Sequence, residues 1–339
     1  MPSLEELVES CKKAQNEYLS YGITTIQEGM FVKELIPIYK KLLEENILKV
    51  DLIAYMDIKA KEEIKKEFPN NIKKYYKHMK IQGYKIFLDG SPQLKTAWMR
   101  TPYKNDEKVK NNKEEAKNKN FGVSTMNTEE VKKAIKISKE ENMQILAHCN
   151  GDMAVNQYIE CIKTEKNTKK IRPVMIHAQL LGKDQLKEIK QNNIIPSFFI
   201  AHTYYWGDTH IKNFGLKRAE QISPTNSSLK NNILFTFHQD SPVIESNMFE
   251  TIWCAVTRKT KAGITLGAEE QISVLEAIKA VTINAAYQYF EENQKGSIKE
   301  GKIADLIILD KNPLKVDIEE IKKIKILETI KNGSTIKTY

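Results

Sequence analysis

The chain of 339 residues has no long apolar run and no paired cysteines. No run of 18 apolar residues exists, so the sequence predicts no transmembrane helix and no membrane partner. Hydrophobic residues make up 41% of the chain, which excludes a disordered protein or a disulfide scaffold. The four cysteines are scattered without a CxxC pair, which indicates free thiols in a reducing, cytoplasmic compartment: Cys11, Cys149, Cys161 and Cys254.

Arginine is scarce, although the formal net charge is +9. Only four of the 53 basic residues are arginines, and arginine is the residue that reads bases and holds phosphates bidentately. The lysines alternate with acidic residues in runs such as KEEIKKE and EEIKKIK, which is typical of solvated helix faces. The composition therefore predicts no nucleic-acid partner.

Glycine-rich phosphate loops are also absent, because no GxGxxG or GxxxxGK[ST] follows any expected strand. This weakens the alternative of a doubly wound, nucleotide-binding sheet. Segments of strand and helix pattern alternate instead, and such alternation predicts a parallel sheet that is buried on both faces. We expect strands at 22–29, 49–57, 83–90, 143–151, 172–180, 193–200 and 231–240. We expect helices at 3–20, 31–46, 58–79 with a break at Pro69, 128–141, 183–191, 247–258 and 272–290.

Seven strand–helix units favour an α/β fold, a TIM-like (β/α)8 barrel with one unit missing. The polar run at 104–120 predicts an exposed insertion. Beyond residue 290 the pattern changes to short strands with tight turns, and we expect residues 296–314 to pair as strands outside the barrel. The predicted domains are therefore an incomplete barrel at 1–290 and a small β portion at 291–339.

Polar side chains lie at or just beyond the carboxyl ends of several expected strands. Lys85 and Asp89, His148, His177 and Asp240 all have this position, which is the catalytic face of a (β/α)8 barrel. Two neutral imidazoles and a carboxylate are a ligand set that suits zinc or a similar divalent ion. Histidines at strand ends are often only hydrogen-bonded structural residues, so the chemistry alone leaves both interpretations open.

The sequence around these residues resembles the amidohydrolase superfamily, in the branch called amidohydrolase family 3, which includes N-substituted formamide deformylases. The motifs that carry the resemblance are KIFLDGSPQLKTAWMRTPY, AHCNGDMA, MIHAQLL, FHQDSPV and GSIKEGKIADLIILDKNPL, in this order along residues 85–314. The resemblance implies a metal-dependent-hydrolase barrel and a small β-sandwich built from both chain ends. It also implies a metal-activated water, with one or two ions such as Zn²⁺, that hydrolyses a non-peptide C–N bond in a small amide-type substrate.

The resemblance also implies roles for individual residues. His148 and His177 match metal ligands of the family, and Asp240 matches an aspartate that binds metal and acts as the general base. Lys85 lies where some members carry a carboxylated lysine that bridges two ions. Asp89, His202 and Trp206 are the expected substrate-binding residues, the last two on a loop after the 193–200 strand: FFIAHTYYWGDTHIKNFGLKR.

One motif of the superfamily is absent. Its first strand carries an HxH pair, whereas the six histidines here are isolated at 78, 148, 177, 202, 210 and 238. We therefore expect a chain that lacks the family's N-terminal part and first strand, with two strand edges facing a gap. The alternative function is an inactive fragment or a partner subunit. Its barrel would be completed by an N-terminal segment carrying HxH, or the chain would form a homo-oligomer.

Overall fold

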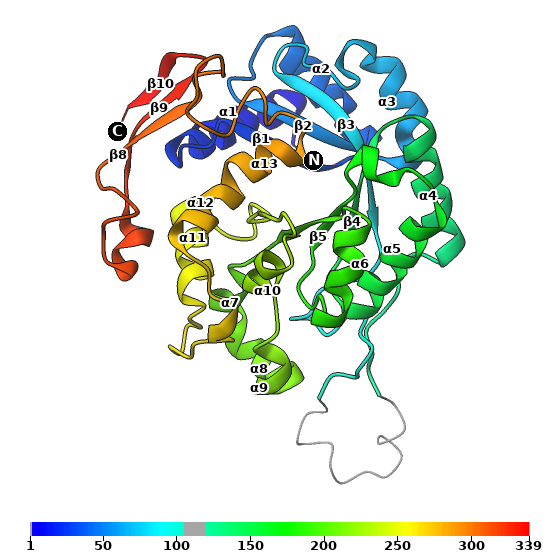
Figure 1. The fold of residues 1–339 in the computed structure, drawn as a ribbon. Helices are drawn as coiled ribbons and strands as arrows, with labels where there is room; N and C mark the ends of the chain where they lie inside the picture. Colours follow the sequence, from blue (N-terminus) through cyan, green and yellow to red (C-terminus); the bar gives the residue numbers. More distant parts are fainter. Residues whose placement is uncertain (1, 105–118, 339) are drawn as a thin grey trace.

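A sheet of seven parallel strands forms the centre of the molecule (Figure 1). The computed structural model describes residues 2–104 and 119–338, so most of the predicted insertion at 104–120 lies outside the described residues. The strands follow one another in the sheet in the same order as in the sequence, which confirms the predicted α/β, TIM-like class. They are β1 (Thr25–Phe31), β2 (Asp51–Asp57), β3 (Met79–Phe87), β4 (Gln144–Cys149), β5 (Val174–His177), β6 (Ile195–Phe198) and β7 (Thr236–Phe237).

The central strands are buried on both faces, and β3 buries the polar residues Lys80, Gln82 and Lys85 together with its apolar ones. Six of seven residues are buried in β2 and eight of nine in β3. The backbones of β3 and β4 approach closely at Gly83, where an added Cβ would lie 2.0 Å from the carbonyl oxygen of Gln144. Glycine is needed there because a side chain would push two paired strands apart.

Helices lie along the outside of the large sheet (Figure 1). The first begins with a capping box, in which Ser3 Oγ accepts from the Glu6 N–H and the Glu6 carboxylate accepts from the Ser3 N–H. These helices are α1 (Leu4–Ser20), α2 (Ile36–Glu44), α3 (Lys61–Glu67), α4 (Thr128–Glu140), α5 (Asp152–Thr164) and α6 (Leu186–Gln191). Short 3₁₀ turns are η1 (Lys33–Leu35), η2 (Ile58–Ala60), η3 (Pro69–Asn71), η6 (Thr168–Ile171), η7 (Lys183–Gln185) and η8 (Ala268–Glu270).

The prediction of helix through residue 79 is wrong beyond Pro69. The Asn71 side-chain amide donates to the backbone oxygens of Tyr76 at 3.1 Å and Met79 at 2.9 Å. These bonds close a turn, and β3 begins at Met79, four residues before the expected start of the strand. An asparagine that hydrogen-bonds nearby backbone competes with helix formation.

The segment between β6 and β7, which has no clear sequence period, folds into four short helices. One buried residue, Arg258, joins this segment to the turn after α11: its guanidinium donates to the carbonyl oxygens of Ile222, Ser223 and Leu266. Burial lowers the pKa of Arg258 to about 10. The four helices are α7 (His202–Tyr205), α8 (Gly207–Phe214), α9 (Leu216–Ala219) and α10 (Thr225–Lys230). After β7 follow α11 (Met248–Thr257), α12 (Val274–Val281) and α13 (Ile283–Gln288).

The C-terminal residues form a separate three-stranded antiparallel sheet on the flank of the molecule (Figure 1). Its strands are β8 (Leu306–Leu309), β9 (Ile326–Lys331) and β10 (Ser334–Thr338), and the turn η9 (Ile318–Lys323) packs against α11. The expectation that 296–314 pairs as strand outside the barrel is correct for β8. The domain boundary at residue 290 stays a prediction.

A cluster of buried ion pairs ties this sheet to the amino-terminal edge of the barrel strands. Asp51, the first residue of β2, binds Lys295 and also Lys331 of β9, the latter at 2.7 Å. Lys331 also binds Asp305 at 2.9 Å, and His78 Nδ1 lies 2.8 Å from Asp51. The four lysine and carboxylate side chains of this group are each at most 9% exposed, so the pairing is shielded from solvent.

The large sheet is open, with β1 and β7 as its edge strands. In the described part of the chain, β1 pairs only with β2, and β7 pairs only with β6. The end of α1 and the loop after β7 meet across this opening, where the Tyr21 hydroxyl donates to Glu245 at 3.3 Å. Among the described helices none is both long and apolar enough to cross a membrane.

Candidate functional site

The carboxyl ends of β4 and β5 bring two predicted site residues together. His148 and His177 belong to these paired strands, and their ring centroids are 4.5 Å apart. His177 is 6% exposed, and its backbone has a φ of 72°, which is uncommon for a residue other than glycine. Burial, together with His148, His238 and Lys85 nearby, holds the pKa of His177 well below its ordinary value. Its imidazole is therefore neutral, the form that ligates metals.

His238 joins this pair. Its Nε2 lies 3.1 Å from Nδ1 of His177, and its Nδ1 lies 3.0 Å from the Ser197 hydroxyl. Burial lowers the pKa of His238 to about 4, although Asp240 opposes this shift. The spacing of two residues from Asp240 places His238 on the same side of its strand, but that pattern does not reveal its hydrogen bond to His177.

Asp89 is the partner of His148. Its carboxylate oxygen lies 3.0 Å from Nδ1 of His148, and the side chain is completely buried. The same carboxylate accepts hydrogen bonds from the backbone N–H groups of Trp98, Asn150 and Gly151 at 2.7–3.2 Å. With its oxygens occupied in this way, Asp89 holds the imidazole in a fixed orientation.

Lys85 and Asp240 lie beside the histidines. Burial lowers the pKa of Lys85 to about 8, although Asp240 opposes this shift. The ammonium group of Lys85 lies 4.7 Å from the ring centre of Phe87, which in turn lies 5.3 Å from His148. Asp240 is exposed and has a φ of 54°, three residues beyond the end of β7. It is thus accessible to a proton or a ligand at this edge.

A second pair of histidines lies behind Phe199. His202 Nδ1 and His210 Nε2 are 3.1 Å apart, and both rings are buried. Phe199 contacts the rings of His202 and His238, with centroids 4.7 and 5.4 Å away. Trp206, the third expected substrate-binding residue, is 4.5 Å from His202. Five of the six histidines therefore form one connected group, the histidine cluster: His148, His177, His238, His202 and His210.

The donor chemistry of this cluster suits a divalent ion, since His148 and His177 are adjacent and His177 is neutral. Within residues 2–104 and 119–338, however, no three or more His, Cys, Asp or Glu side chains are grouped so that they could hold a metal ion. The set of Lys85, His148, His177 and Asp240 as metal ligands thus stays a proposal.

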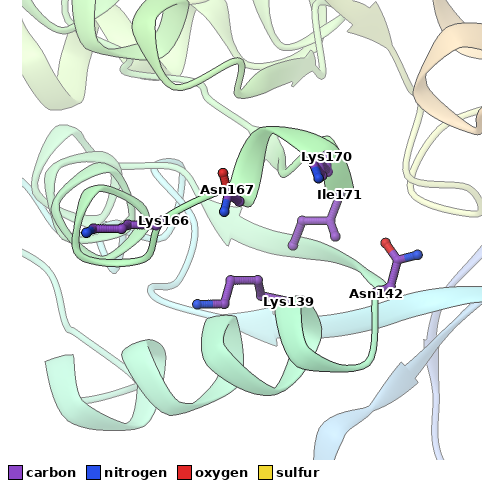
Figure 2. Close-up of a pocket in the computed structure, with 6 residues that line it drawn as sticks. All are labelled: Lys139, Asn142, Lys166, Asn167, Lys170 and Ile171. Atoms are coloured by element: carbon purple, nitrogen blue, oxygen red, sulfur yellow. The ribbon is translucent and has the colours of Figure 1, made fainter.

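A depression elsewhere on the surface is unrelated to this site. Figure 2 shows its lining, in which lysines predominate: Lys139, Asn142, Lys166, Asn167, Lys170 and Ile171. Asn142 and Ile171 lie just before β4 and β5 begin, so the depression is at the opposite ends of these strands from the histidine cluster.

Fold and site together define the class of protein: a barrel-like parallel α/β protein with its polar cluster at the carboxyl ends of the strands. The model of the Amidohydrolase family matches residues 1–336, and the chain belongs to this family. This bears out the family predicted from the motifs.

Relatives and a solved structure agree with this assignment. YtcJ from Bacillus subtilis is 24% identical over 265 residues, which are 76% of this chain and 47% of YtcJ. The N-substituted formamide deformylase of Arthrobacter pascens is 25% identical over 193 residues, 56% of this chain and 34% of that protein. An uncharacterized metal-dependent hydrolase from Pyrococcus furiosus has the same fold, with a TM-score of 0.79 at 23% identity over 93% of this chain and 62% of that one. The chain thus spans about half the length of YtcJ, and about a third of the deformylase is matched.

Proposed function

We propose that this chain is a metal-dependent hydrolase of a non-peptide C–N bond in a small amide-type molecule. The adjacent imidazoles of His148 and His177 at the ends of neighbouring strands carry the proposal. Family membership supports it, and so does the relative named as an N-substituted formamide deformylase. The cytoplasmic setting is part of the proposal, and all four thiols are unpaired.

The proposed metal ligands are Lys85, His148, His177 and Asp240. When bound, a divalent ion such as Zn²⁺ polarises the substrate carbonyl and lowers the pKa of water to about 7. Asp240, exposed at the site edge, acts as the general base and accepts the proton of the attacking water. With its pKa near 8, Lys85 is partly unprotonated at neutral pH and can form a carbamate with carbon dioxide, releasing a proton.

The hydrogen bonds around both imidazoles leave one unprotonated nitrogen on each ring. If His148 donates its Nδ1 proton to Asp89, its Nε2 is unprotonated and accepts from the side-chain amide of Asn150 at 3.3 Å, so a bound ion would replace this hydrogen bond. If His177 donates from Nδ1 to His238, and His238 donates from Nδ1 to Ser197, Nε2 of His177 keeps a free lone pair. We keep His202 and Trp206 in the proposed substrate-binding set and assign Asp89 to the orientation of His148.

The two sheet ends favour a second candidate. Because β1 and β7 each have one strand neighbour in the described residues, another segment could pair between them. If that segment carried HxH, it would supply the imidazoles that complete a metal site. On this view the chain is an inactive fragment or a partner subunit until the segment binds.

Metal content and turnover of the purified chain distinguish the two candidates. Zinc would be measured by elemental analysis, and hydrolysis would be followed with N-substituted formamides and other small amides. The variants His148→Ala and His177→Ala should lose both properties. His78→Gln is the matched control, because His78 is the one histidine outside the cluster.

Near-stoichiometric zinc and turnover in the chain alone, lost in both alanine variants, would support the first candidate. A metal-free, inactive chain that gains both on addition of a separately expressed HxH segment would support the second. A chain that binds no zinc and hydrolyses none of the amides, alone or with the segment, would contradict both.

A further inference from the structure

The pairing of His202 and His210 fixes how their protons are shared. Burial and the neighbouring His210 and His238 hold the pKa of His202 well below its ordinary value, and burial lowers that of His210 to about 3. Both rings are neutral, so each carries one N–H. Their planes are within 5° of each other, and one proton lies between His202 Nδ1 and His210 Nε2.

The outer nitrogen of His210 decides between the two possible arrangements. His210 Nδ1 is buried and has no hydrogen-bond partner among the described residues. If His202 donated to His210, the proton of His210 would have to be on this nitrogen, as a buried N–H without an acceptor. Orphaned buried N–H groups are rarer than acceptors that lack a donor, so the opposite arrangement is favoured.

We infer that His210 is a positioning residue: it donates from Nε2 to Nδ1 of His202 and so holds the proton of His202 on Nε2. That N–H is on the ring edge away from His210. Among the described residues, His210 Nδ1 is a completely buried nitrogen without a hydrogen-bond partner and His202 Nε2 is not, so the His202 N–H can meet water or a ligand. The His202 ring contacts Phe199 and Trp206, and Phe199 is packed against His177 and His238.

A fixed N–H donor beside the proposed site selects a particular ligand chemistry. It would bind a hydrogen-bond acceptor such as the carbonyl oxygen of an amide, whose charge grows when water attacks the carbonyl carbon. It would disfavour a ligand that presents a cation or an N–H there. This use of the donor rests on the proposed function, whereas the position of the proton does not.

The proton positions can be measured without any activity. Nitrogen NMR of the full chain, labelled with ¹⁵N-histidine, distinguishes protonated from unprotonated ring nitrogens. Comparison with His202→Gln identifies the His202 signals. In the wild-type protein His202 should carry its proton on Nε2 and His210 on Nε2. A His202 proton on Nδ1 would overturn the inference, even if the amide assays succeed.

Two variants test the role of His210. His210→Gln keeps a side-chain N–H donor and should preserve the Nε2–H form of His202. His210→Phe keeps the ring but removes the donor, and His202 should then populate both N–H forms. Circular dichroism verifies that each variant is folded. An unchanged His202 in folded His210→Phe would overturn the positioning role, and if that variant does not fold, the wild-type spectrum decides. With an active substrate, His210→Phe should lower kcat at least tenfold and His210→Gln should restore most of it.

Discussion

Asp89 and His148 form a buried carboxylate–imidazole pair, with Oδ1 of Asp89 3.0 Å from Nδ1 of His148. Three backbone N–H groups from two separate loops converge on the same carboxylate: those of Trp98, Asn150 and Gly151. One side chain therefore joins the loops after β3 and β4 and also orients an imidazole at the candidate site.

Asp89→Asn should affect both stability and the candidate metal site. The asparagine amide would direct its NH₂ toward backbone N–H donors. Each buried polar group that is left without a hydrogen-bond partner costs about 1–3 kcal/mol. We expect a lower midpoint of thermal unfolding and a 10–100-fold lower zinc affinity, the effect of about that size seen when partners of metal-binding histidines are removed. Asp208→Asn is the control, because within residues 2–104 and 119–338 this half-buried carboxylate accepts a single hydrogen bond, from the backbone N–H of Ala262. Equal zinc binding by Asp89→Asn and wild type would contradict the assigned role.

The pairing of Asp51 predicts a pH dependence of stability. Burial raises the pKa of Asp51, but His78, Lys295 and Lys331 lower it more, so the folded pKa is below the ordinary value. A carboxyl group with a depressed folded pKa stabilises the protein above its unfolded pKa of about 3.9. This stability is lost as the pH falls through the folded pKa.

We therefore expect the free energy of unfolding of the wild type to fall more steeply below pH 4 than that of Asp51→Asn. At pH 7 the substitution should cost about 1.5–3 kcal/mol, because it removes a charged partner from Lys295 and Lys331, which keep their ion pairs with Glu291 and Asp305. Urea titrations at several pH values measure both effects, with the exposed carboxylate variant Glu44→Gln as the control. Parallel pH profiles for wild type and Asp51→Asn would show that this pairing is not stabilising.

Gly83→Ala should destabilise the sheet, because the new Cβ would clash with the backbone of Gln144. Overpacking of this kind costs about 1–3 kcal/mol, and more where backbone rather than a flexible side chain has to move. Gly29→Ala is a matched control in another strand, where the nearest atom is a side-chain nitrogen 4.0 Å away. Chemical denaturation of the two variants should separate them, and equal midpoints would contradict the close approach of β3 and β4.

Arg258→Met should loosen the segment between β6 and β7. The substitution removes the donors to Ile222, Ser223 and Leu266 and leaves three buried carbonyl groups without this partner. We expect a loss of about 3 kcal/mol or more in the free energy of unfolding. Hydrogen exchange should increase in residues 216–230. Arg258→Lys should recover only part of the stability, since an ammonium group cannot reach three divergent acceptors. Unchanged exchange in Arg258→Met would refute this role.

The strands of the large sheet could be predicted from the sequence because turn residues bound them and apolar or β-branched residues predominate in most of them, although β1 is only half-buried and β3 contains polar residues. The start of β3 could not be predicted from the sequence, because it depends on two hydrogen bonds from Asn71 to backbone atoms five and eight residues away. The positions of His148 and His177 followed from motifs and strand order. The fixed orientation of His148 could not be predicted in this way, because the carboxylate of Asp89 is held by backbone groups from two separate loops. The His202–His210 bond likewise depends on how two short helices pack, and no periodic pattern indicates them.

The bond between Lys331 and Asp51 links residues that are 280 positions apart in the chain. A ribosome synthesises Asp51 first, and the lysine from β9 follows only after 280 further residues. During that interval the carboxylate at the start of β2 lacks one of its buried cations. Folding at this edge therefore cannot be completed before β9 is synthesised, and a premature stop codon before residue 331 would leave a nascent chain whose β2 carries an incompletely paired charge.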